Sequence, residues 1–380
     1  MFYKHLKPFI FILISLFILC SCEKKEILIG FSGELTGINS DLGIHGRNGA
    51  ALAIEEINNS GGINGKKLSL LVKDDEGKPE KAKQTDKELI KEGVTAIIGH
   101  MTSSQTMAAL PEIEKSDVIL LSPTTSTPLL SEKKDKFFRI QGSSEFSACA
   151  LGSFASQNFD IKNFLILKTE DNKNFTEPYQ KNFLKCFAKN NTPITHKTIP
   201  LEIEQVKDFL INIYSKKDYQ GILIITSARR TTVIAQVLYQ MEKKPLLFIS
   251  SWGATEALVR HGGKSVENAY LAKTGFTEKT RKDYKNFLEK YIARFGKVPS
   301  FSAEQGYLSV KILALALEKT KGKKQGLENA ITNIKNYNSF QGNLTIDEFG
   351  DTILPVSIVQ VKNGKLDKIL EIEPKRNFLK

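Results

Sequence analysis

The chain has 380 residues, with 54 Lys plus Arg against 42 Asp plus Glu, and a formal net charge of +12 at pH 7. This length suffices for two ordinary domains. A nucleic-acid-binding surface would place basic residues in blocks with aromatic ones, whereas here the lysines are scattered, as over residues 78–91. The charge therefore indicates a solvated basic surface, and no nucleic-acid partner is expected.

The first 22 residues have the layout of a secretory signal. A basic start precedes an apolar run over residues 8–19 that is too short for a transmembrane helix. The run ends in Leu19-x-Ser21-Cys22, which resembles the bacterial lipobox, where a small residue precedes the lipid-bearing cysteine. We expect residues 1–21 to be a signal peptide and Cys22 to be the lipid attachment site. The protein would then lie in the cell envelope, held at a membrane and facing the periplasm or the cell exterior. The alternative is an ordinary signal peptide followed by a chance cysteine.

Short β-rich runs alternate with amphipathic segments along the mature chain, which predicts parallel sheets flanked by helices. Strands are expected at residues 27–31, 68–73, 94–98, 118–121, 164–167, 221–226 and 246–250. Helices are expected at residues 46–58, 81–91, 104–115, 145–158, 175–189, 229–241, 279–295 and 303–319. The alternation occurs twice over, as an α/β protein with two doubly wound parallel sheets requires.

The last part of the chain has a different pattern, with β-rich pieces at residues 343–346, 355–361 and 366–373. Asn363-Gly364 between two such pieces predicts a hairpin. Residues 347–351 are acidic but lack the remaining oxygen ligands of a calcium site, so we expect a turn there.

Two cysteines, Cys149 and Cys186, remain after the N-terminal pair. Both lie in apolar helical segments, where a buried thiol is stable. We expect free thiols, because two cysteines on separate helices rarely meet disulfide geometry. The alternative is one disulfide formed in an oxidising compartment.

Spaced segments over essentially the whole mature chain follow one collinear pattern. They are Ile29 to Gly37, Gly46 to Asn58, Gly61 to Lys66, Val72 to Asp75, Ile97 to Ser104, Leu121 to Ser126, Phe340 to Asp351 and Val359 to Gly364. Together they resemble the branched-chain amino acid binding proteins of ABC transporters, which have the periplasmic binding protein type I fold. The resemblance implies two doubly wound lobes that three crossover segments join and that close on a ligand like a hinge.

The expected lobe boundaries follow from this resemblance. Lobe 1 comprises residues 22–141 and 275–345, and lobe 2 comprises residues 142–274 and 346–380. The crossovers are expected near Arg139 to Ser143, Lys273 to Phe276 and Leu344 to Asp347.

Hydroxyl-bearing residues follow two strands of lobe 1. Ser103 and Ser104 lie where a buried strand meets a helix start, whose free backbone N–H groups suit a carboxylate, and Thr124 and Ser126 follow the next strand. The resemblance implies that Ser103 holds the ligand carboxylate. It also implies that Thr124 and Ser126 supply a backbone carbonyl and a hydroxyl for the carboxylate and ammonium. The alternative is plain N-capping of the helices.

Lobe 2 departs from the amino acid binders. Trp252, the sole tryptophan, stands where the resemblance places the glutamate that neutralises the ligand ammonium. We therefore expect a carboxylate-bearing ligand with an apolar or aromatic end, and a branched-chain amino acid is the runner-up. Trp252 either stacks on this ligand or belongs to the core. The family disulfide is also absent, since Gly77 and Thr102 occupy its two positions.

Four more side chains complete the expected ligand-binding set. Phe175 matches an aromatic lid position of the family, and Leu42 replaces an aromatic residue of a lobe 1 loop. Arg229 either pairs with a second carboxylate or caps its helix in solvent. Glu304 either restores an ammonium partner or is an exposed residue at a helix start.

An enzyme would show an activated nucleophile, a metal cluster or a cofactor loop. His45, His100, His196 and His261 have no Cys or acidic partner at ligand spacing and are expected in surface or capping roles. We therefore expect no enzymatic activity, no cofactor and no metal. The expected function is capture of a small amino acid or related organic carboxylate and its delivery to the permease subunits of an ABC transporter. The alternative is a ligand-sensing lipoprotein that signals to a membrane receptor.

Overall fold

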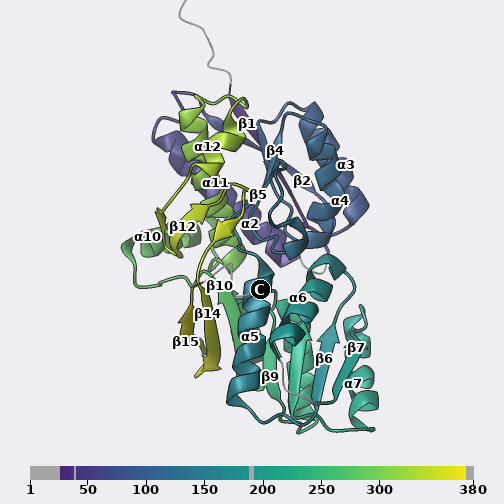
Figure 1. Cartoon of the computed structure of the whole chain (residues 1–380). Helices are drawn as coiled ribbons and strands as arrows, with labels where there is room; N and C mark the ends of the chain where they lie inside the picture. The colour runs from purple at the N-terminus through teal and green to yellow at the C-terminus, as the bar shows by residue number, and fades with distance from the viewer. Residues whose placement is uncertain (1–25, 38–39, 188–191, 374–380) are drawn as a thin grey trace, which may run out of the picture.

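The computed structural model of the chain describes residues 26–37, 40–187 and 192–373. They form two α/β lobes, which lie one above the other in Figure 1 and confirm the predicted fold class. Within these residues no helix is long and apolar enough to cross a membrane. The expected signal peptide and Cys22 lie outside the described residues.

A five-stranded parallel sheet with the order β2-β1-β3-β4-β5 forms the centre of lobe 1. Its strands are β1 (Ile27–Gly33), β2 (Leu68–Asp74), β3 (Ala96–Ile98), β4 (Ile119–Ser122) and β5 (Phe137–Arg139). The helices packed on it are α2 (Ser40–Asn59), α3 (Pro79–Lys91), α4 (Ser103–Glu114), α10 (Lys282–Phe295), α11 (Phe301–Lys319) and α12 (Leu327–Thr332). Strands β3 and β4 are buried throughout, which explains their continuous apolar sequences.

Helices α2 and α11 touch through glycines. A Cβ atom on Gly49 would lie 1.9 Å from the carbonyl oxygen of Ala303, and one on Gly306 would lie 2.1 Å from that of Gly46. No side chain fits at either position. This contact fixes the starts of both helices, which carry Leu42 and Phe301, on the same edge of the lobe.

A seven-stranded sheet with the order β15-β14-β10-β9-β8-β6-β7 forms the centre of lobe 2. Its strands are β6 (Phe164–Lys168), β7 (Ile194–Thr198), β8 (Gly221–Ile225), β9 (Leu246–Ile249), β10 (Tyr270–Thr274), β14 (Val356–Lys362) and β15 (Lys365–Ile372). Its helices are α5 (Ser144–Asn158), α6 (Lys173–Cys186), α7 (Val206–Tyr214), α8 (Ala228–Gln240) and α9 (Glu256–Gly262). Strands β14 and β15 are antiparallel and joined at Asn363-Gly364, both with positive φ, so the predicted hairpin is confirmed.

Three passages connect the lobes. The chain crosses between β5 and α5, between β10 and α10, and between β13 (Thr352–Ile353) and β14. The third passage lies later than the expected 344–347, because β13 first pairs with β12 (Gly342–Ile346), which also pairs with β11 (Tyr337–Ser339). The acidic segment before β13 forms the expected turn, in which the Asp347 carboxylate accepts hydrogen bonds from the N–H groups of Phe349 and Asp351.

Cys149 and Cys186 form a disulfide, so the expectation of free thiols was wrong. Cys149 lies in α5, and Cys186 is the last residue of α6. The two helices approach closely at Gly152, where a Cβ atom would lie 2.4 Å from the carbonyl oxygen of Phe183. This contact brings the two cysteine Cα atoms to 5.0 Å, within the range that a disulfide spans.

Candidate ligand-binding site

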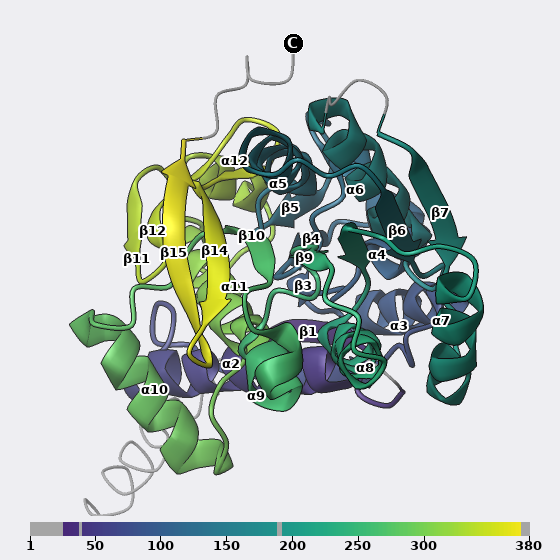
Figure 2. The same ribbon diagram turned by 90° about the horizontal axis from the view of Figure 1, so that it is seen from below.

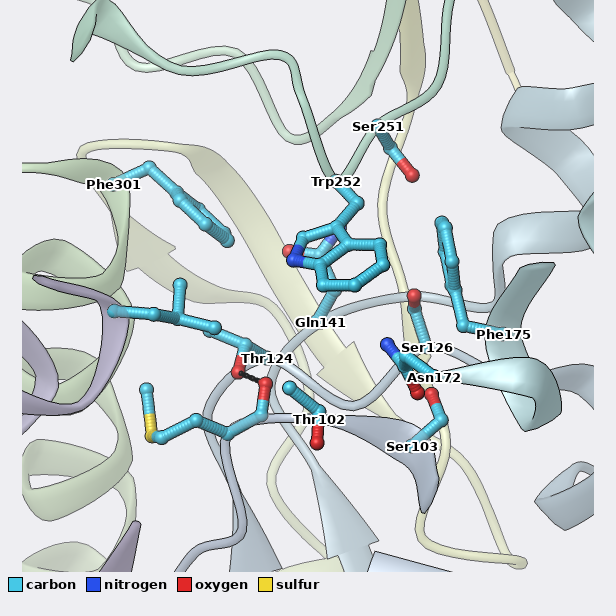
Figure 3. Close-up of a pocket in the computed structure, with 12 residues that line it drawn as sticks. Thr102, Ser103, Thr124, Ser126, Gln141, Asn172, Phe175, Ser251, Trp252 and Phe301 are labelled. Atoms are coloured by element: carbon cyan, nitrogen blue, oxygen red, sulfur yellow. Dashed lines mark hydrogen bonds between the residues drawn. The ribbon is translucent and has the colours of Figure 1, made fainter. Parts of the chain in front are cut away.

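A small cavity of about 40 Å³ lies between the lobes at the carboxyl ends of their strands. Its lining residues come from both lobes and from the first crossing (Figure 3). They are Leu42, Met101, Thr102, Ser103, Thr124, Ser126, Gln141, Asn172, Phe175, Ser251, Trp252 and Phe301. Ligands of doubly wound proteins bind at this place, beyond the carboxyl ends of parallel strands.

The start of α4 forms one wall of the cavity. Thr102 is the N-cap residue, but its side chain does not cap the helix, and its Oγ1 atom is buried without a partner among the described residues. Ser103 follows as the first helical residue and is also buried. The first N–H groups of a helix have no intrahelical acceptor. Thr102 thus differs from the capping alternative. The N–H of Ser104 is already bonded to Asn172, so the part of this helix start that adjoins the cavity is Ser103.

Thr124 and Ser126 lie beside this helix start, after β4. The hydroxyl of Thr124 donates a hydrogen bond to the carbonyl oxygen of Met101 at 2.6 Å, drawn as the dashed line in Figure 3. The carbonyl oxygen of Ser126 accepts a hydrogen bond from the N–H of Ser144 at 2.7 Å, at the first crossing. The loop after β4 is therefore tied both to the α4 start and to the hinge.

Aromatic side chains dominate the lobe 2 wall. Trp252, just after β9, meets Phe175 of α6 edge to face, with ring centroids 5.8 Å apart. In Figure 3 the indole ring of Trp252 lies between Phe301 and Phe175, above the hydroxyl groups of lobe 1. Trp252 packs against the lobe 2 core and also lines the cavity, and its stacking on a ligand stays a prediction.

No charged side chain belongs to the described lining of this cavity. The α4 start is a region of positive potential, because helix dipoles place a partial positive charge at the N-terminus. A carboxylate suits such a position, and a cation does not. The arrangement therefore favours an anionic group next to Ser103 and supplies no carboxylate for an ammonium group.

His100 supports the loop that carries Met101 to Ser103. It is fully buried, with Nδ1 2.8 Å from a carboxylate oxygen of Asp75 and Nε2 3.1 Å from one of Asp86. Burial alone lowers the pKa of His100, but the two carboxylates outweigh it and raise the pKa to about 10. The expected surface or capping role of His100 was wrong. His45 is likewise buried and bonded to the Tyr291 hydroxyl.

Three of the predicted ligand-binding residues, Ser104, Arg229 and Glu304, lie outside the cavity. Ser104 joins the lobes directly, because its N–H donates to the side-chain oxygen of Asn172 at 3.1 Å. Arg229 lines a neighbouring cavity, described below. The other six predicted residues line the cavity itself. They are Leu42, Ser103, Thr124, Ser126, Phe175 and Trp252.

Glu304 is only 7% exposed, so its interpretation as an exposed helix-start residue was wrong. Its carboxylate accepts hydrogen bonds from Thr277 at 2.5 Å and from Gln341 at 3.2 Å, which lie near the second and third crossings. Burial raises the pKa of Glu304, and the bond from Thr277 opposes the rise. This residue thus belongs to the hinge and does not line the cavity.

The remaining six lining residues were not predicted. They are Met101, Thr102, Gln141, Asn172, Ser251 and Phe301. Asn172 follows β6 at the carboxyl edge of the lobe 2 sheet, so the rule that selected Thr124 also applies to it. Thr102 and Ser251 are direct neighbours of predicted residues, whereas Phe301 reaches the cavity only through the packing of α11 on α2.

The fold and the cavity define a two-lobed binding protein of the type I class. A family model described as periplasmic binding protein matches residues 26–365, and the chain belongs to that family. The family and fold are those of solute-binding proteins, which are not enzymes.

Two relatives illustrate the similarity in sequence. A leucine-, isoleucine-, valine-, threonine- and alanine-binding protein from Pseudomonas aeruginosa is 30% identical over 148 residues, which are 39% of this chain and 40% of that protein. Leu/Ile/Val-binding protein homolog 1 from Brucella suis is 24% identical over 337 residues, which are 87% of this chain and 88% of that protein. The first alignment thus spans less than half of the Pseudomonas protein.

Solved structures share the fold. The leucine-binding protein LivK from Thermotoga maritima has a TM-score of 0.80 at 22% identity, over 92% of this chain and 99% of that chain. A solute-binding protein of an ABC transporter from R. palustris, solved with benzoate, has a TM-score of 0.81 at 17% identity, over 92% and 97%. Because both identities are low, these likenesses concern the fold alone.

Proposed function

We propose that the protein is a lipid-anchored, extracytoplasmic solute-binding protein of an ABC transporter. It captures a small carboxylate-bearing ligand with an apolar or aromatic body between its lobes and delivers that ligand to the permease subunits. The observation that carries this proposal is the uncharged interlobe cavity, with the α4 start at Ser103 on one side and Trp252 and Phe175 on the other.

The wall chemistry supports an acid over an amino acid. A zwitterion would bring an ammonium group into a cavity whose described lining has no carboxylate. Burying an unpaired cation costs several kcal/mol. The ring face of Trp252 attracts a cation by only about 0.5–2 kcal/mol, which does not offset that cost.

The ligands of proteins with the same fold include organic acids as well as amino acids. One fold neighbour was solved with benzoate, while others bind leucine or isoleucine. Both ligand classes carry a carboxylate, and they differ in the ammonium group. The disulfide between Cys149 and Cys186 also suits a protein exported to an oxidising compartment.

Removing the hydroxyl of Ser103 is expected to weaken binding of benzoate and of 4-methylpentanoate. Ser103→Ala should cost about 1–3 kcal/mol, because a buried charged group loses a hydrogen-bond partner. Ser126→Ala should have an effect of the same order. Calorimetric titration of the mature protein measures these losses, and mass spectrometry of small molecules released from gently purified protein identifies the natural ligand.

Ser104→Ala is the matched comparison, since its hydroxyl lies at the same helix start but outside the cavity, where it accepts a long hydrogen bond of 3.4 Å from the N–H of Asn174. We expect it to weaken binding less than Ser103→Ala. Equal losses in the two variants would contradict the assignment of Ser103 to the ligand. If no carboxylate binds and the released ligand has no acidic group, the proposed function itself fails.

The lipid anchor rests on Leu19-x-Ser21-Cys22 after the apolar run. In a bacterial host, Cys22→Ser is expected to abolish lipid labelling and to leave either uncleaved precursor or protein that washes off the membrane fraction, because the lipid chain supplies membrane affinity. Cys20→Ser is the control and should leave labelling intact. Normal labelling of the Cys22→Ser variant would overturn the assignment.

A further inference from the structure

A second, larger cavity of about 440 Å³ adjoins the interlobe cavity, and we refer to it as the outer cavity. Leu42, Trp252 and Phe301 line both cavities, so these three apolar side chains stand at their common boundary. The rest of the outer cavity is built by the starts of α2 and α8 and by α9, which can be located in Figure 2. A ligand that passes the apolar boundary would thus touch both spaces.

Arginines dominate the charge of the outer cavity. Arg229, in the first turn of α8, and Arg260, in α9, both line it, are exposed and form no ion pair among the described residues. The neighbouring Arg230 behaves differently, since it is buried and paired with Asp171 at 2.6 Å. Of these two adjacent arginines of one helix, only Arg230 has an ion-pair partner among the described residues.

One carboxylate, that of Asp41, belongs to the described lining of the outer cavity. It is engaged by His45, whose Nε2 lies 3.4 Å from it. This contact lowers the pKa of Asp41, and the nearby Arg260 lowers it further. A single carboxylate does not balance two guanidinium groups, so the outer cavity keeps a surplus of positive charge.

The start of α8 adds donors to these charges. This helix has 13 residues and no acidic residue in its first turn, whereas α2 has Asp41 there. Its N-cap residue Ser227 is 7% exposed, and Thr255 across the cavity is 8% exposed. Neither hydroxyl oxygen has a hydrogen-bond partner among the described residues. Buried hydroxyls without partners are costly, and an anion seated there would satisfy them.

We propose that the outer cavity is a second anion-binding subsite and that the ligand is a diacid whose two acidic groups flank an apolar body. One carboxylate lies at the α4 start beside Ser103, and the apolar body passes Leu42, Trp252 and Phe301. The second carboxylate lies at the α8 start between Arg229 and Arg260. This inference rests on the proposed function, because it extends the same ligand from the first cavity into the second.

Matched acids test this subsite. The mature protein is titrated at low salt with the straight-chain diacids from adipate to sebacate and with the corresponding monoacids from hexanoate to decanoate. At least one diacid is expected to bind about tenfold or more tightly than its monoacid, since charge-assisted hydrogen bonds are the strong ones. Arg229→Gln and Arg260→Gln should each reduce this preference, because they lower diacid affinity more than monoacid affinity. Lys264→Gln removes the same charge from an exposed site of the same lobe and should change neither value.

The outcomes separate the two proposals. Monoacids that bind while no diacid exceeds its monoacid overturn the second subsite and leave the proposed function intact. A diacid preference that survives in the Arg229→Gln, Arg260→Gln double variant also overturns it. If none of these acids binds while benzoate or 4-methylpentanoate does, the inference fails and the proposed function stands. If no carboxylate binds and the released ligand has no acidic group, the proposed function fails and the inference fails with it.

Discussion

Replacing Trp252 by glutamate is expected to weaken the binding of benzoate about a hundredfold or more, which corresponds to about 2.7 kcal/mol or more. The new carboxylate would stand at the boundary between the interlobe cavity, whose described lining has no basic side chain, and the outer cavity, which Arg229 and Arg260 line. A benzoate carboxylate beside Ser103 would face it within the interlobe cavity. Two like unit charges about 5 Å apart repel by about 3 kcal/mol at an effective dielectric constant of 20. The aromatic contact with the ligand is lost as well.

Trp252→Gln separates these two contributions, because it removes the ring without adding a charge. We expect its loss of benzoate affinity to be smaller than that of Trp252→Glu. The glutamate should at the same time raise the affinity for leucine above that of the wild type, since it supplies an ammonium partner. Benzoate affinity that is unchanged in Trp252→Glu would show that Trp252 does not face the ligand. Calorimetric titration of the wild type, Trp252→Gln and Trp252→Glu with benzoate and with leucine measures these affinities.

Arg139→Met is expected to lower the free energy of unfolding by about 3–5 kcal/mol, the usual loss when a buried ion pair loses one partner. Arg139 is 0% exposed, and its guanidinium lies 2.7 Å from a carboxylate oxygen of Asp351. It also donates to the carbonyl oxygen of Thr127 and to the hydroxyl of Ser131. The pair fastens the turn before β13 to β5, beside the first and third crossings. Chemical denaturation measures the loss.

Arg294→Met is the matched control for this variant. Arg294 also faces a carboxylate, that of Glu55 at 3.1 Å, but its side chain is largely exposed. Exposed ion pairs contribute about 0–1 kcal/mol, so the control should unfold almost like the wild type. Equal losses in the two variants would contradict the special role of the hinge pair.

The loss in Arg139→Met should depend on pH. Burial raises the pKa of Asp351 above the ordinary 3.8, and Arg139 opposes this rise. Without Arg139 the pKa rises further. A carboxyl group with a raised pKa in the folded state favours folding below its ordinary pKa, and this contribution disappears as the pH rises through the folded-state value. The deficit of the variant is therefore expected to be smallest near pH 4 and to grow toward pH 7.

The sequence predicts β3, β4, β6, β8 and β9 because they are continuous apolar runs. It does not predict β10, a central strand of lobe 2 whose short sequence includes Lys273 and Thr274. It also does not predict β7, whose residues Ile194–Thr198 are largely exposed and polar, or β5, which has only three residues. Such edge strands are defined by pairing with a neighbour and not by their own pattern. The short helices α7, α9 and α12 are not predicted either, since their positions depend on contacts with the rest of each lobe.

Some residues of the candidate site can likewise be predicted from the sequence, whereas others depend on how the helices pack. Residues that directly follow a predicted strand, such as Ser103 and Thr124, are accessible to sequence reasoning because parallel strands end at a common edge. Glu304 and Phe301 belong to one helix start, yet Phe301 reaches the cavity while Glu304 is bonded to the crossings. That difference depends on how α11 packs on α2. The bond between Cys149 and Cys186 likewise depends on a helix contact that only the fold reveals.

The most direct test of the preference for an acid over an amino acid compares the calorimetric affinities of the mature protein for leucine and for 4-methylpentanoate. These ligands share the carboxylate and the branched aliphatic chain and differ by the ammonium group. We predict that 4-methylpentanoate binds about tenfold or more tightly than leucine, because the cavity offers its carboxylate the α4 start and offers an ammonium group no anionic partner. Tighter binding of leucine would contradict the account and would make the protein an amino acid receptor.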